Sequence, residues 1–264
     1  MLTQPVRPAI FITGAAAGIG RATALRFARG GWFVGATDAD PQALQRLRQE
    51  LGADHFTAPL DVCDADAWAA TLAAFWQAAG QRLDVLLNNA GIAVTAAFEE
   101  APVQRHQRLV DVNLKGVIHG CHAAHRYLRQ TRHSLVINMC SASALYGQPM
   151  LSTYSATKAA VRSLTEALNI EWARQGIQVT DLLPLFVNTD MVRHEVSRMK
   201  TVGVLGVKLS AEDIAQQAWA RANARHRRLS VHTHVGLQTK VFALLAKLSP
   251  DAVNRLVTAK LGGY

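Results

Sequence analysis

The 264-residue sequence contains no long hydrophobic run and no closely spaced pair of cysteines. Its apolar stretches are far shorter than the roughly 18 residues that a membrane-spanning helix requires, so we expect no membrane span. Cys63, Cys121 and Cys140 lie far apart, which argues against a zinc ribbon, a redox dithiol and a disulfide framework. The first residues form no apolar signal segment. We therefore expect a cytoplasmic protein in a reducing compartment.

Clustered metal-binding histidines are also absent, although the sequence contains ten histidines. None has HExxH spacing, and His119, His122 and His125 fit an exposed helix face better than a metal site. The net charge is +9, but the basic residues are scattered, without an RGG run or zinc-finger spacing. We therefore predict neither a metal site nor nucleic-acid binding. The positive charge indicates a solvated basic surface or some attraction for anionic substrates.

Short apolar runs alternate with amphipathic segments along the chain. The first run, Ala9–Thr13, precedes a glycine-rich turn, and helical segments of ten or more residues separate many of the later runs. This alternation predicts βαβ units, and therefore an α/β fold with a parallel sheet of about seven strands and helices on both faces. No repeat or linker divides residues 1–264, so we expect one domain. The expected strands lie near 9–13, 32–37, 55–60, 83–87, 134–139, 177–183 and 228–232. The expected helices lie near 19–29, 41–51, 65–79, 102–130 (with a break near Asp111), 152–175, 210 onward, 237–248 and 251–261.

A glycine-rich turn, Thr13-Gly-Ala-Ala-Ala-Gly-Ile-Gly20, joins the first predicted strand to the first helix. Gly14, Gly18 and Gly20 would let the backbone bend sharply and approach a pyrophosphate at the positive end of that helix. Similar turns also occur without a ligand, so the motif alone is weak. Its position between strand and helix favours a dinucleotide site.

Asp38 ends the second predicted strand, 18 positions after Gly20. This spacing is close to that of a carboxylate that binds the adenosine ribose. There Asp38 would accept hydrogen bonds from the ribose hydroxyls of NAD and repel the 2′-phosphate of NADP. The alternative is an exposed turn aspartate, because Asp40 and Pro41 follow. We predict NAD as the cofactor, with NADP less favoured.

Three motifs together carry a family resemblance: the TGxxxGxG turn, Asn88-Asn-Ala-Gly91, and Tyr154 with Lys158 four positions later. In this order they resemble the short-chain dehydrogenase/reductase family, from Thr13 to about Met191. The resemblance implies a doubly wound, Rossmann-like fold, a nicotinamide cofactor and hydride transfer between a carbonyl and an alcohol. It implies a cofactor half at about 8–135 and a catalytic and substrate part at about 136–264.

The resemblance also implies roles for single residues. Asn113, Ser141, Tyr154 and Lys158 match the family's catalytic residues, and Ser141 stands at the usual 13 positions before Tyr154. Leu185 replaces the glycine of the family's PGxxxT segment, so this turn departs from the family's pattern. The implied cofactor-binding residues are Gly14, Gly18, Ile19, Gly20, Asp38, Asp61, Val62, Asn89, Gly91, Tyr154, Lys158, Val187 and Thr189.

Three further positions bear on the resemblance. Members that prefer NADP usually carry a basic residue where this chain has Ala17 or Ala39, so these alanines favour NAD. Cys140 occupies a position often filled by serine; we assign the catalytic role to Ser141 and interpret Cys140 as a small buried filler.

The implied catalytic residues suit proton transfer to or from a substrate oxygen. A tyrosine has a pKa near 10 and is a poor base at neutral pH. Lys158 shares a helix face with Tyr154, and its ammonium, together with an oxidised nicotinamide, would stabilise the phenolate. Ser141 would hydrogen-bond the substrate oxygen, and Asn113 would hold a water that links Lys158 to solvent. Each residue also fits an ordinary structural role, so the joint pattern carries the prediction.

The apolar segment 190–210 predicts a lid over a lipophilic ketone or secondary alcohol, with core packing as an equally open alternative. A second candidate activity is 3-oxoacyl-carrier-protein reduction, for which Arg129 and Arg132 could meet an acidic carrier protein. A third is a cofactor-binding regulatory protein without catalysis, which the intact set of catalytic residues disfavours. The amphipathic tail around 241–245 could lie on a membrane surface. Burial against a partner subunit explains it more simply, since the family usually forms homodimers or homotetramers.

Overall fold

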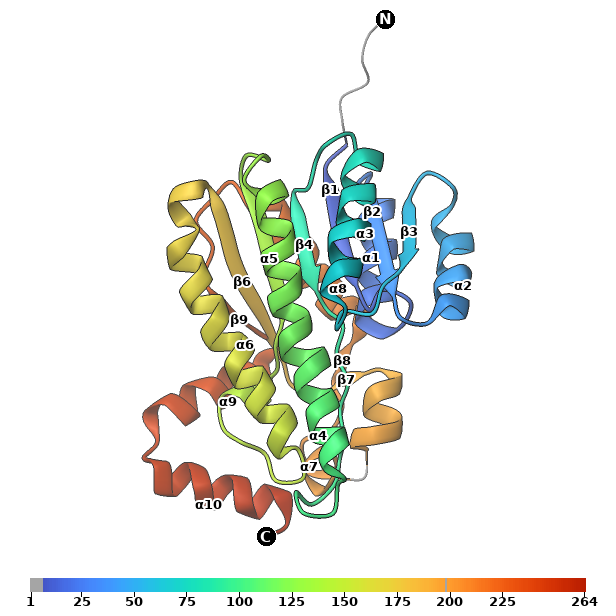
Figure 1. Cartoon of the computed structure of the whole chain (residues 1–264). Helices are drawn as coiled ribbons and strands as arrows, with labels where there is room; N and C mark the ends of the chain where they lie inside the picture. Colours follow the sequence, from blue (N-terminus) through green and yellow to red (C-terminus); the bar gives the residue numbers. More distant parts are fainter. Residues whose placement is uncertain (1–6, 198) are drawn as a thin grey trace, which may run out of the picture.

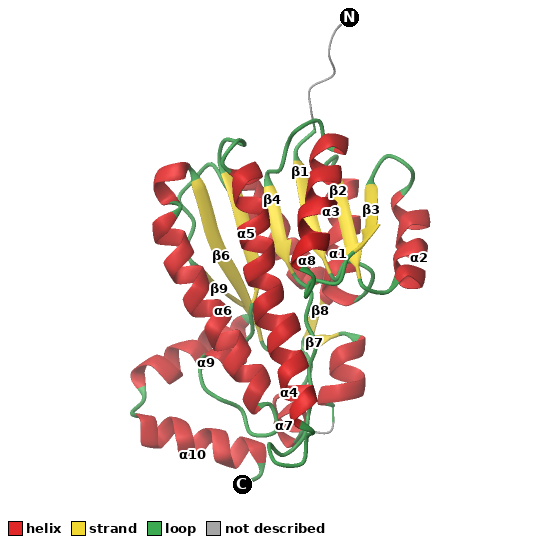
Figure 2. Cartoon of the chain, viewed as in Figure 1, coloured by secondary structure: helices red, strands yellow, loops and turns green. Residues whose placement is uncertain are grey.

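A seven-stranded parallel sheet runs through the molecule, and the computed structural model describes it within residues 7–197 and 199–264 (Figures 1 and 2). The strand order is β3-β2-β1-β4-β5-β6-β9. The order therefore reverses between β1 and β4, and ligands bind at such switch points in open α/β sheets. The strands are β1 (Ala9–Thr13), β2 (Phe33–Asp38), β3 (Phe56–Pro59), β4 (Val85–Asn88), β5 (Ser134–Met139), β6 (Ile177–Pro184) and β9 (His232–Val235).

Helices cover both faces of the sheet, as the alternating sequence pattern predicts (Figure 2). One layer consists of α3 (Ala65–Ala78), α5 (Gly116–Leu128) and α6 (Ser152–Glu171). The other consists of α1 (Gly18–Arg29), α2 (Pro41–Leu51) and α8 (Ala211–Asn223). The remaining helices are α4 (Val103–Val110), α7 (Lys200–Leu205), α9 (Leu237–Leu248) and α10 (Asp251–Gly262), and β7 (Val187–Asn188) pairs with β8 (Leu209–Ser210).

The core lies on both sides of the central strands because successive side chains of a strand point to opposite faces. In β1, Phe11 packs with Trp68 and Phe75 on one face, whereas Ile10 and Ile12 belong to the cluster on the other. All three β1 side chains are fully buried. Such burial on both faces explains why this strand reads as a continuous apolar run.

Local capping signals fix where two helices begin. The Asp40 carboxylate accepts hydrogen bonds from the backbone N–H groups of Gln42 and Ala43, at 2.9 and 3.0 Å, and Pro41 occupies the first turn of α2. Ser210 and Asp213 form a capping box at the start of α8, where the sequence predicts a helix from 210 onward.

The last strand differs from the expected range of 228–232: β9 spans His232–Val235. The residues after α8 form turns, in which Arg227 N–H donates to the Ala224 carbonyl at 2.8 Å. His232 then pairs with Asp181 of β6, and this pairing sets the start of the strand. The sequence His-Thr-His has no apolar pattern, because this strand is positioned by polar contacts. The predicted range was therefore wrong.

A buried ion cluster joins distant parts of the chain at the amino ends of β1 and β4. The Asp84 carboxylate is fully buried and accepts from Arg82 at 2.6 Å, from Arg225 at 2.8 Å and from the backbone N–H of Ala9 at 2.8 Å. The Arg225 guanidinium also lies 5.0 Å from the ring centre of Trp32. A buried carboxylate needs such partners, because an unpaired charge in the interior is costly.

Within residues 7–197 and 199–264, no helix has the length and apolar character needed to cross a bilayer. The same described residues contain no group of three or more His, Cys, Asp or Glu side chains arranged to hold a metal ion.

Candidate active site

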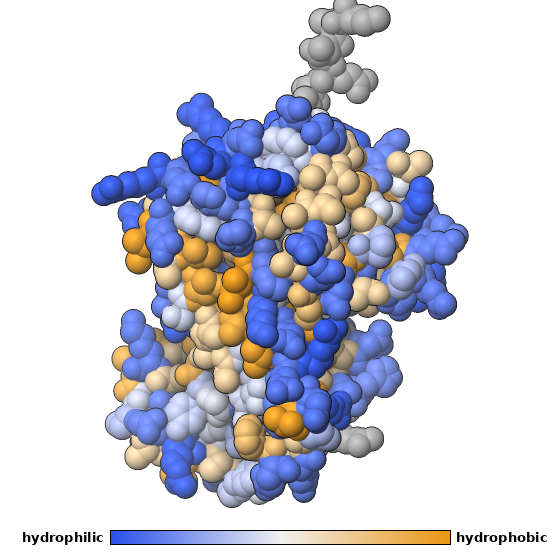
Figure 3. All heavy atoms as spheres, viewed as in Figure 1, coloured by the Kyte–Doolittle hydropathy of each residue, from blue (hydrophilic) through white to orange (hydrophobic). Residues whose placement is uncertain are grey.

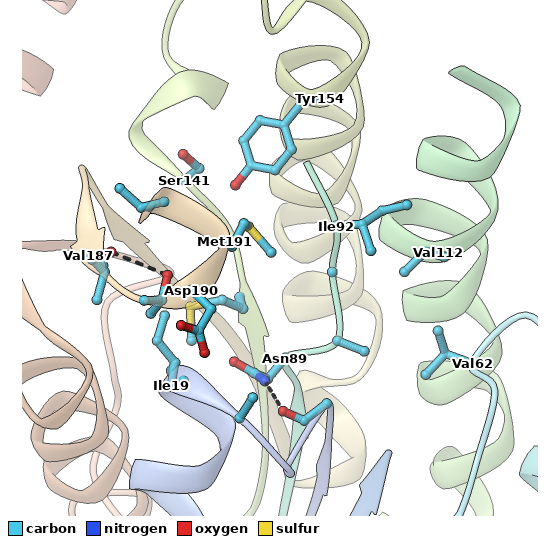
Figure 4. A pocket seen from close by; sticks show the side chains of 18 of the residues that line it. Ile19, Val62, Asn89, Ile92, Val112, Ser141, Tyr154, Val187, Asp190 and Met191 are labelled. Atoms are coloured by element: carbon cyan, nitrogen blue, oxygen red, sulfur yellow. Dashed lines mark hydrogen bonds between the residues drawn. The ribbon is translucent and has the colours of Figure 1, made fainter. Parts of the chain in front are cut away.

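A cavity of about 340 Å³ opens at the carboxyl ends of the strands, beside the switch point between β1 and β4 (Figure 4). It receives side chains from the glycine-rich turn, from the ends of β2, β4, β5 and β6, and from α6. Most residues that the sequence assigns to the cofactor line it. These are Gly14, Gly18, Ile19, Asp38, Asp61, Val62, Asn89, Gly91, Tyr154, Lys158, Val187 and Thr189.

The glycine-rich turn has a backbone that side chains would disturb. Gly14 and Gly18 have φ angles of +61° and +49°, in the left-handed region. A Cβ at Gly20 would lie only 2.0 Å from the Gly14 carbonyl oxygen. Gly20 does not line the cavity. Its lack of a side chain allows the Gly14 backbone to pack against it, which makes the tight turn possible. The turn presents the start of α1, where backbone N–H groups favour an anion.

Asn89, the first residue after β4, supports this turn. Its side-chain amide donates to the carbonyl oxygens of Thr13 at 3.0 Å and Gly14 at 2.9 Å, and Figure 4 draws one of these two bonds. The Thr13 hydroxyl in turn accepts from the backbone N–H groups of Asn89 and Ala90, each at 3.1 Å. These reciprocal bonds hold the two loops of the switch point together and fix the floor of the cavity.

Asp38 lies at the end of β2 and lines the cavity beside Ala17 and Ala39. One carboxylate oxygen accepts from the backbone N–H of Ala16 at 2.9 Å, and the other accepts from that of Asp40 at 3.0 Å. Two backbone donors therefore orient the carboxylate at the cavity wall.

Arg21 lies in α1, one helix turn after Ala17, and is a cation that could offset the negative charge of Asp38. Its guanidinium is paired with Glu50, with Nε donating to a carboxylate oxygen at 3.2 Å. Arg21 does not line the cavity.

The far end of the cavity contains a residue that the sequence did not single out. Arg108 of α4 lines the cavity together with Asp61 and Val62. Its guanidinium donates to the Asp61 carboxylate and to the Cys63 sulfur, each at 3.2 Å. The Cys63 backbone N–H, with a smaller contribution from Arg108, lowers the pKa of Asp61. Arg108 stands one helix turn before Val112, another wall residue, and this spacing was the available signal.

The side chains of Tyr154 and Ser141 lie close together in the cavity, with the Tyr154 hydroxyl on the side of Ser141 (Figure 4). Ser141 follows β5 and caps a short 3₁₀ turn, where its hydroxyl oxygen accepts from the backbone N–H of Ser143 at 3.2 Å. Burial raises the pKa of Tyr154 to about 12, while hydrogen bonding to Ser141 acts in the opposite direction. The protein side chains alone therefore keep the phenol protonated.

Lys158 lies one turn further along α6 and is buried. Its ammonium donates to the Met139 carbonyl oxygen at 2.8 Å and lies 5.6 Å from the centre of the Tyr154 ring. Burial lowers the pKa of Lys158. Cys140 also packs here, with its thiol directed at the Lys158 carbonyl oxygen at 3.3 Å, and burial raises its pKa to about 12. A neutral, buried thiol matches the filler interpretation.

Asn113 lies behind the cavity rather than on its wall. The expected helix break near Asp111 is a π-helical turn, Asp111–Lys115, which carries Asn113. The Asn113 side chain accepts from the Ile92 backbone N–H at 2.8 Å and donates to the Ile92 carbonyl at 2.9 Å. A Cβ at Gly91 would lie 3.3 Å from Asn113 Oδ1 and 3.7 Å from Lys158 Nζ. Asn113 and Lys158 therefore converge on the same short piece of backbone.

A second, smaller cavity of about 70 Å³ adjoins the first beyond Tyr154. Ser141, Tyr154, Leu185, Met191 and Val192 line both cavities. Leu185, which stands where the family has glycine, therefore forms part of the wall between them. Most of the other lining residues are apolar. Val196, Met199 and Leu205 come from the segment 190–210, Phe242 and Leu261 come from the tail, and Ala93, Leu151 and Phe186 come from other loops.

Comparison with known proteins agrees with this arrangement. The family model described as short chain dehydrogenase matches residues 8–200. The Rhizobium radiobacter serine 3-dehydrogenase is 33% identical over 226 residues, covering 82% of this chain and 89% of that protein. An uncharacterized short-chain type dehydrogenase/reductase of Sinorhizobium fredii is 35% identical over 206 residues; the match covers 78% of this chain but 37% of that protein's length.

A solved structure also has the same fold. The 3-ketoacyl-(acyl-carrier-protein) reductase from Brucella melitensis, complexed with NADH, superposes with a TM-score of 0.80 and 26% identity, over 88% of this chain and 98% of that one. The match of the family model to most of the chain, the relatives and the sheet topology lead to one conclusion. The chain belongs to the short-chain dehydrogenase/reductase family of oxidoreductases.

Proposed function

We propose that this oxidoreductase uses NAD to interconvert a lipophilic ketone and its secondary alcohol, with Tyr154 as the proton-transfer residue. The observation that carries the proposal is the position of Tyr154 and Ser141. Both side chains line the larger cavity and the smaller, mostly apolar one. A cofactor in the larger cavity and a substrate in the smaller one would therefore meet beside these two side chains.

The larger cavity fits a dinucleotide. The glycine-rich turn offers close backbone approach and a helix N-terminus for a pyrophosphate, and Asp38 offers an acceptor for ribose hydroxyls. We assign the adenine to the end formed by Asp61, Val62 and Arg108. Val187 and Thr189 would contact the nicotinamide end. When bound, the nicotinamide ring supplies or accepts the hydride.

The side chains around Tyr154 would manage the proton. The Tyr154 hydroxyl donates its proton to the substrate oxygen during reduction and takes it back during oxidation. Ser141 orients that oxygen by a hydrogen bond. Since burial raises the pKa of Tyr154 to about 12, oxidation requires positive charge near the phenol. The Lys158 ammonium and the oxidised nicotinamide would together provide it.

Lys158 and Asn113 would complete the path to solvent. Lys158 passes a proton on from the Tyr154 region, and Asn113 holds the Ile92 backbone against which a linking water can bind. In this proposal Asn113 acts through the backbone that it positions.

The apolar character of the smaller cavity supports a lipophilic substrate. Met191, Val192, Val196 and Met199 come from the segment 190–210, and they pack around the cavity with Tyr154. We therefore favour the lid interpretation of this segment over the alternative of core packing alone. Polar substrates would lose hydration on entry, and this mostly apolar lining would return few hydrogen bonds beyond those of Ser141 and Tyr154.

A second candidate is reduction of a 3-oxoacyl thioester on a carrier protein. The similarity to the Brucella melitensis reductase favours it, and that enzyme was solved with NADH, so an NAD preference does not separate the two activities. Arg129 is exposed at the end of α5 and could contact an acidic carrier.

The deciding experiment is a turnover screen with NADH and NADPH, followed by reduced-nicotinamide absorbance. It compares hydrophobic ketones and secondary alcohols with 3-oxoacyl thioesters. The proposal expects the best kcat/KM for a hydrophobic ketone or alcohol with NAD(H). Higher efficiency with the thioester would favour the second candidate, and no turnover with any compound would support a regulatory, non-catalytic protein.

The exposed faces of α4, α5 and α6 support a homo-oligomer, in line with the family's usual dimers or tetramers. Ile118 of α5 and Ile170 of α6 are 43% and 77% exposed, and apolar residues gather over these helices in Figure 3. Apart from Ile170 and the terminal Glu171, the exposed positions of α6 are small, which would allow a second copy to approach closely: Ser152, Ala156, Ala159, Ser163 and Ala167.

A further inference from the structure

Helix α9 is apolar on two opposite faces. Its inward face consists of Thr239, Phe242, Ala243 and Ala246, all buried or half-buried. Its outward face carries leucines and a valine at intervals of three or four residues, so they form one stripe along the helix. These residues are Leu237, Val241, Leu244, Leu245 and Leu248, with exposed fractions of 77, 47, 58, 56 and 71%.

Helix α10 continues this apolar surface after Pro250. Val253, Leu256 and Val257 are 44, 65 and 44% exposed, while Thr258 and Leu261 face the protein. Of the fifteen exposed large apolar side chains in the described residues, nine lie between 237 and 264. Such a concentration marks an interaction surface, whereas single exposed leucines do not. We call the outward residues of α9 and α10 the tail surface.

The charges around the tail surface are almost all positive. Lys240 and Lys247 border the stripe of α9, and Arg255 and Lys260 lie on α10, whereas Asp251 is the single acidic side chain of the two helices. Figure 3 shows apolar and hydrophilic residues interspersed where Figure 1 places these helices. A second copy docking here would bring like charges together. An anionic lipid surface would accept both the apolar side chains and the lysines.

The tail surface also borders the proposed substrate cavity. Phe242 of α9 and Leu261 of α10 line that cavity from the inner side of the same helices. If the outward stripes rest in a lipid headgroup layer, the cavity lies next to the layer in which lipophilic ketones and alcohols accumulate.

We propose that α9 and α10 bind the surface of an anionic bilayer, with their apolar stripes inserted and their lysines on the headgroups. This binding is peripheral, since no described helix could span the bilayer. It goes beyond the proposed function and does not depend on it: a variant without turnover, Tyr154→Phe, is expected to bind vesicles as the unmodified protein does.

The test is flotation of the full chain with phosphatidylcholine vesicles, with and without about one third phosphatidylglycerol. We expect flotation with the anionic vesicles, and at least a tenfold lower vesicle partition coefficient for Leu244→Ser/Leu248→Ser. The matched control is Phe98→Ser/Val103→Ser, which removes apolar groups of similar exposure, 60 and 59%, far along the chain and is expected to float normally. Circular dichroism verifies that each variant is folded.

A second variant tests the charges. Lys240→Glu/Lys247→Glu is expected to lose binding to anionic vesicles, because it replaces attraction by repulsion. Absence of flotation with anionic vesicles, or unchanged flotation of the leucine variant, would overturn the proposal. Loss of an oligomer in light scattering on Leu244→Ser/Leu248→Ser, without vesicle binding by the unmodified protein, would instead assign the tail surface to a second copy.

Discussion

At the scale of single residues, the buried environment of Tyr154 means that neighbouring polar groups must assist its proton transfer. Burial raises its pKa to about 12 even with the hydrogen bond to Ser141, far above the pH at which enzymes work. The hydroxyl of Ser141 and the ammonium of Lys158 are the polar groups placed to act on the phenol or on the substrate oxygen. Proton transfer therefore depends on a few polar contacts within an otherwise apolar environment.

Tyr154→Phe is expected to lower kcat by roughly 10²–10⁴-fold, the usual contribution of general acid–base catalysis. The dissociation constant of NADH, measured by fluorescence, is expected to change little, since the ring and the cavity wall remain. Tyr146→Phe is the control, because Tyr146 lines neither of the two cavities at the site. A variant that retains most of its turnover would refute the role of Tyr154.

Asp38 is expected to give at least a tenfold preference for NADH over NADPH in kcat/KM, equivalent to about 1.4 kcal/mol. Its oriented carboxylate would repel a 2′-phosphate, and Arg21 is occupied by Glu50. Asp38→Asn keeps the shape, removes the charge and should shrink the preference. Ala39→Arg should begin to reverse it, because a guanidinium binds two phosphate oxygens. Equal efficiency with NADPH in the unmodified protein would contradict this prediction.

At the scale of secondary-structure elements, the sequence predicts the central strands and the edge strand β3 well, and the edge strand β9 poorly. Strands such as β1 are continuous apolar runs because both faces are buried. Strand β9 lies at the edge and is positioned by polar partners from β6 and α6, which no local pattern reveals. Phe242 and Leu261 were not predicted to line the cavity. Only the tertiary fold places the tail beside it, and no local sequence pattern shows this.

The β9 edge contains a pH-dependent contact. His232 Nδ1 lies 2.9 Å from the Asp181 carboxylate and Nε2 lies 2.9 Å from Glu166, with Arg162 and His234 also near. The hydrogen bond to Asp181 raises the pKa of His232 above 6.5. The folded protein therefore binds this proton more tightly than the unfolded chain does. The resulting stability is present below about pH 6.5 and is lost as the pH rises through the raised pKa.

His232→Gln is accordingly expected to reduce the free energy of unfolding more at pH 6 than at pH 9, as measured by urea denaturation. His122→Gln on the exposed side of α5 serves as the control and should show no such dependence. An equal loss at both pH values would mean that His232 contributes through packing alone.

At the scale of the whole molecule, assembly through α4, α5 and α6 would leave the tail surface free for lipid. Ala159→Glu places a charge in the small-residue face of α6 and is expected to shift light-scattering mass from an oligomer to the monomer at micromolar concentration. Gln45→Glu adds the same charge on exposed α2 and should leave the mass unchanged. A monomeric unmodified protein would contradict the proposed interface.

The buried Asp84 cluster has a consequence for synthesis on the ribosome. Asp84 belongs to the first third of the chain, but one of its two cations, Arg225, is translated about 140 residues later. Helix α1 likewise packs against α8, which begins at Ala211. Until that segment leaves the exit tunnel, the face of α1 that packs against α8 stays exposed. The Asp84 carboxylate also lacks its ion pair with Arg225. Vectorial folding of the cofactor half is therefore incomplete, and chaperone engagement should persist until release of the last quarter of the polypeptide.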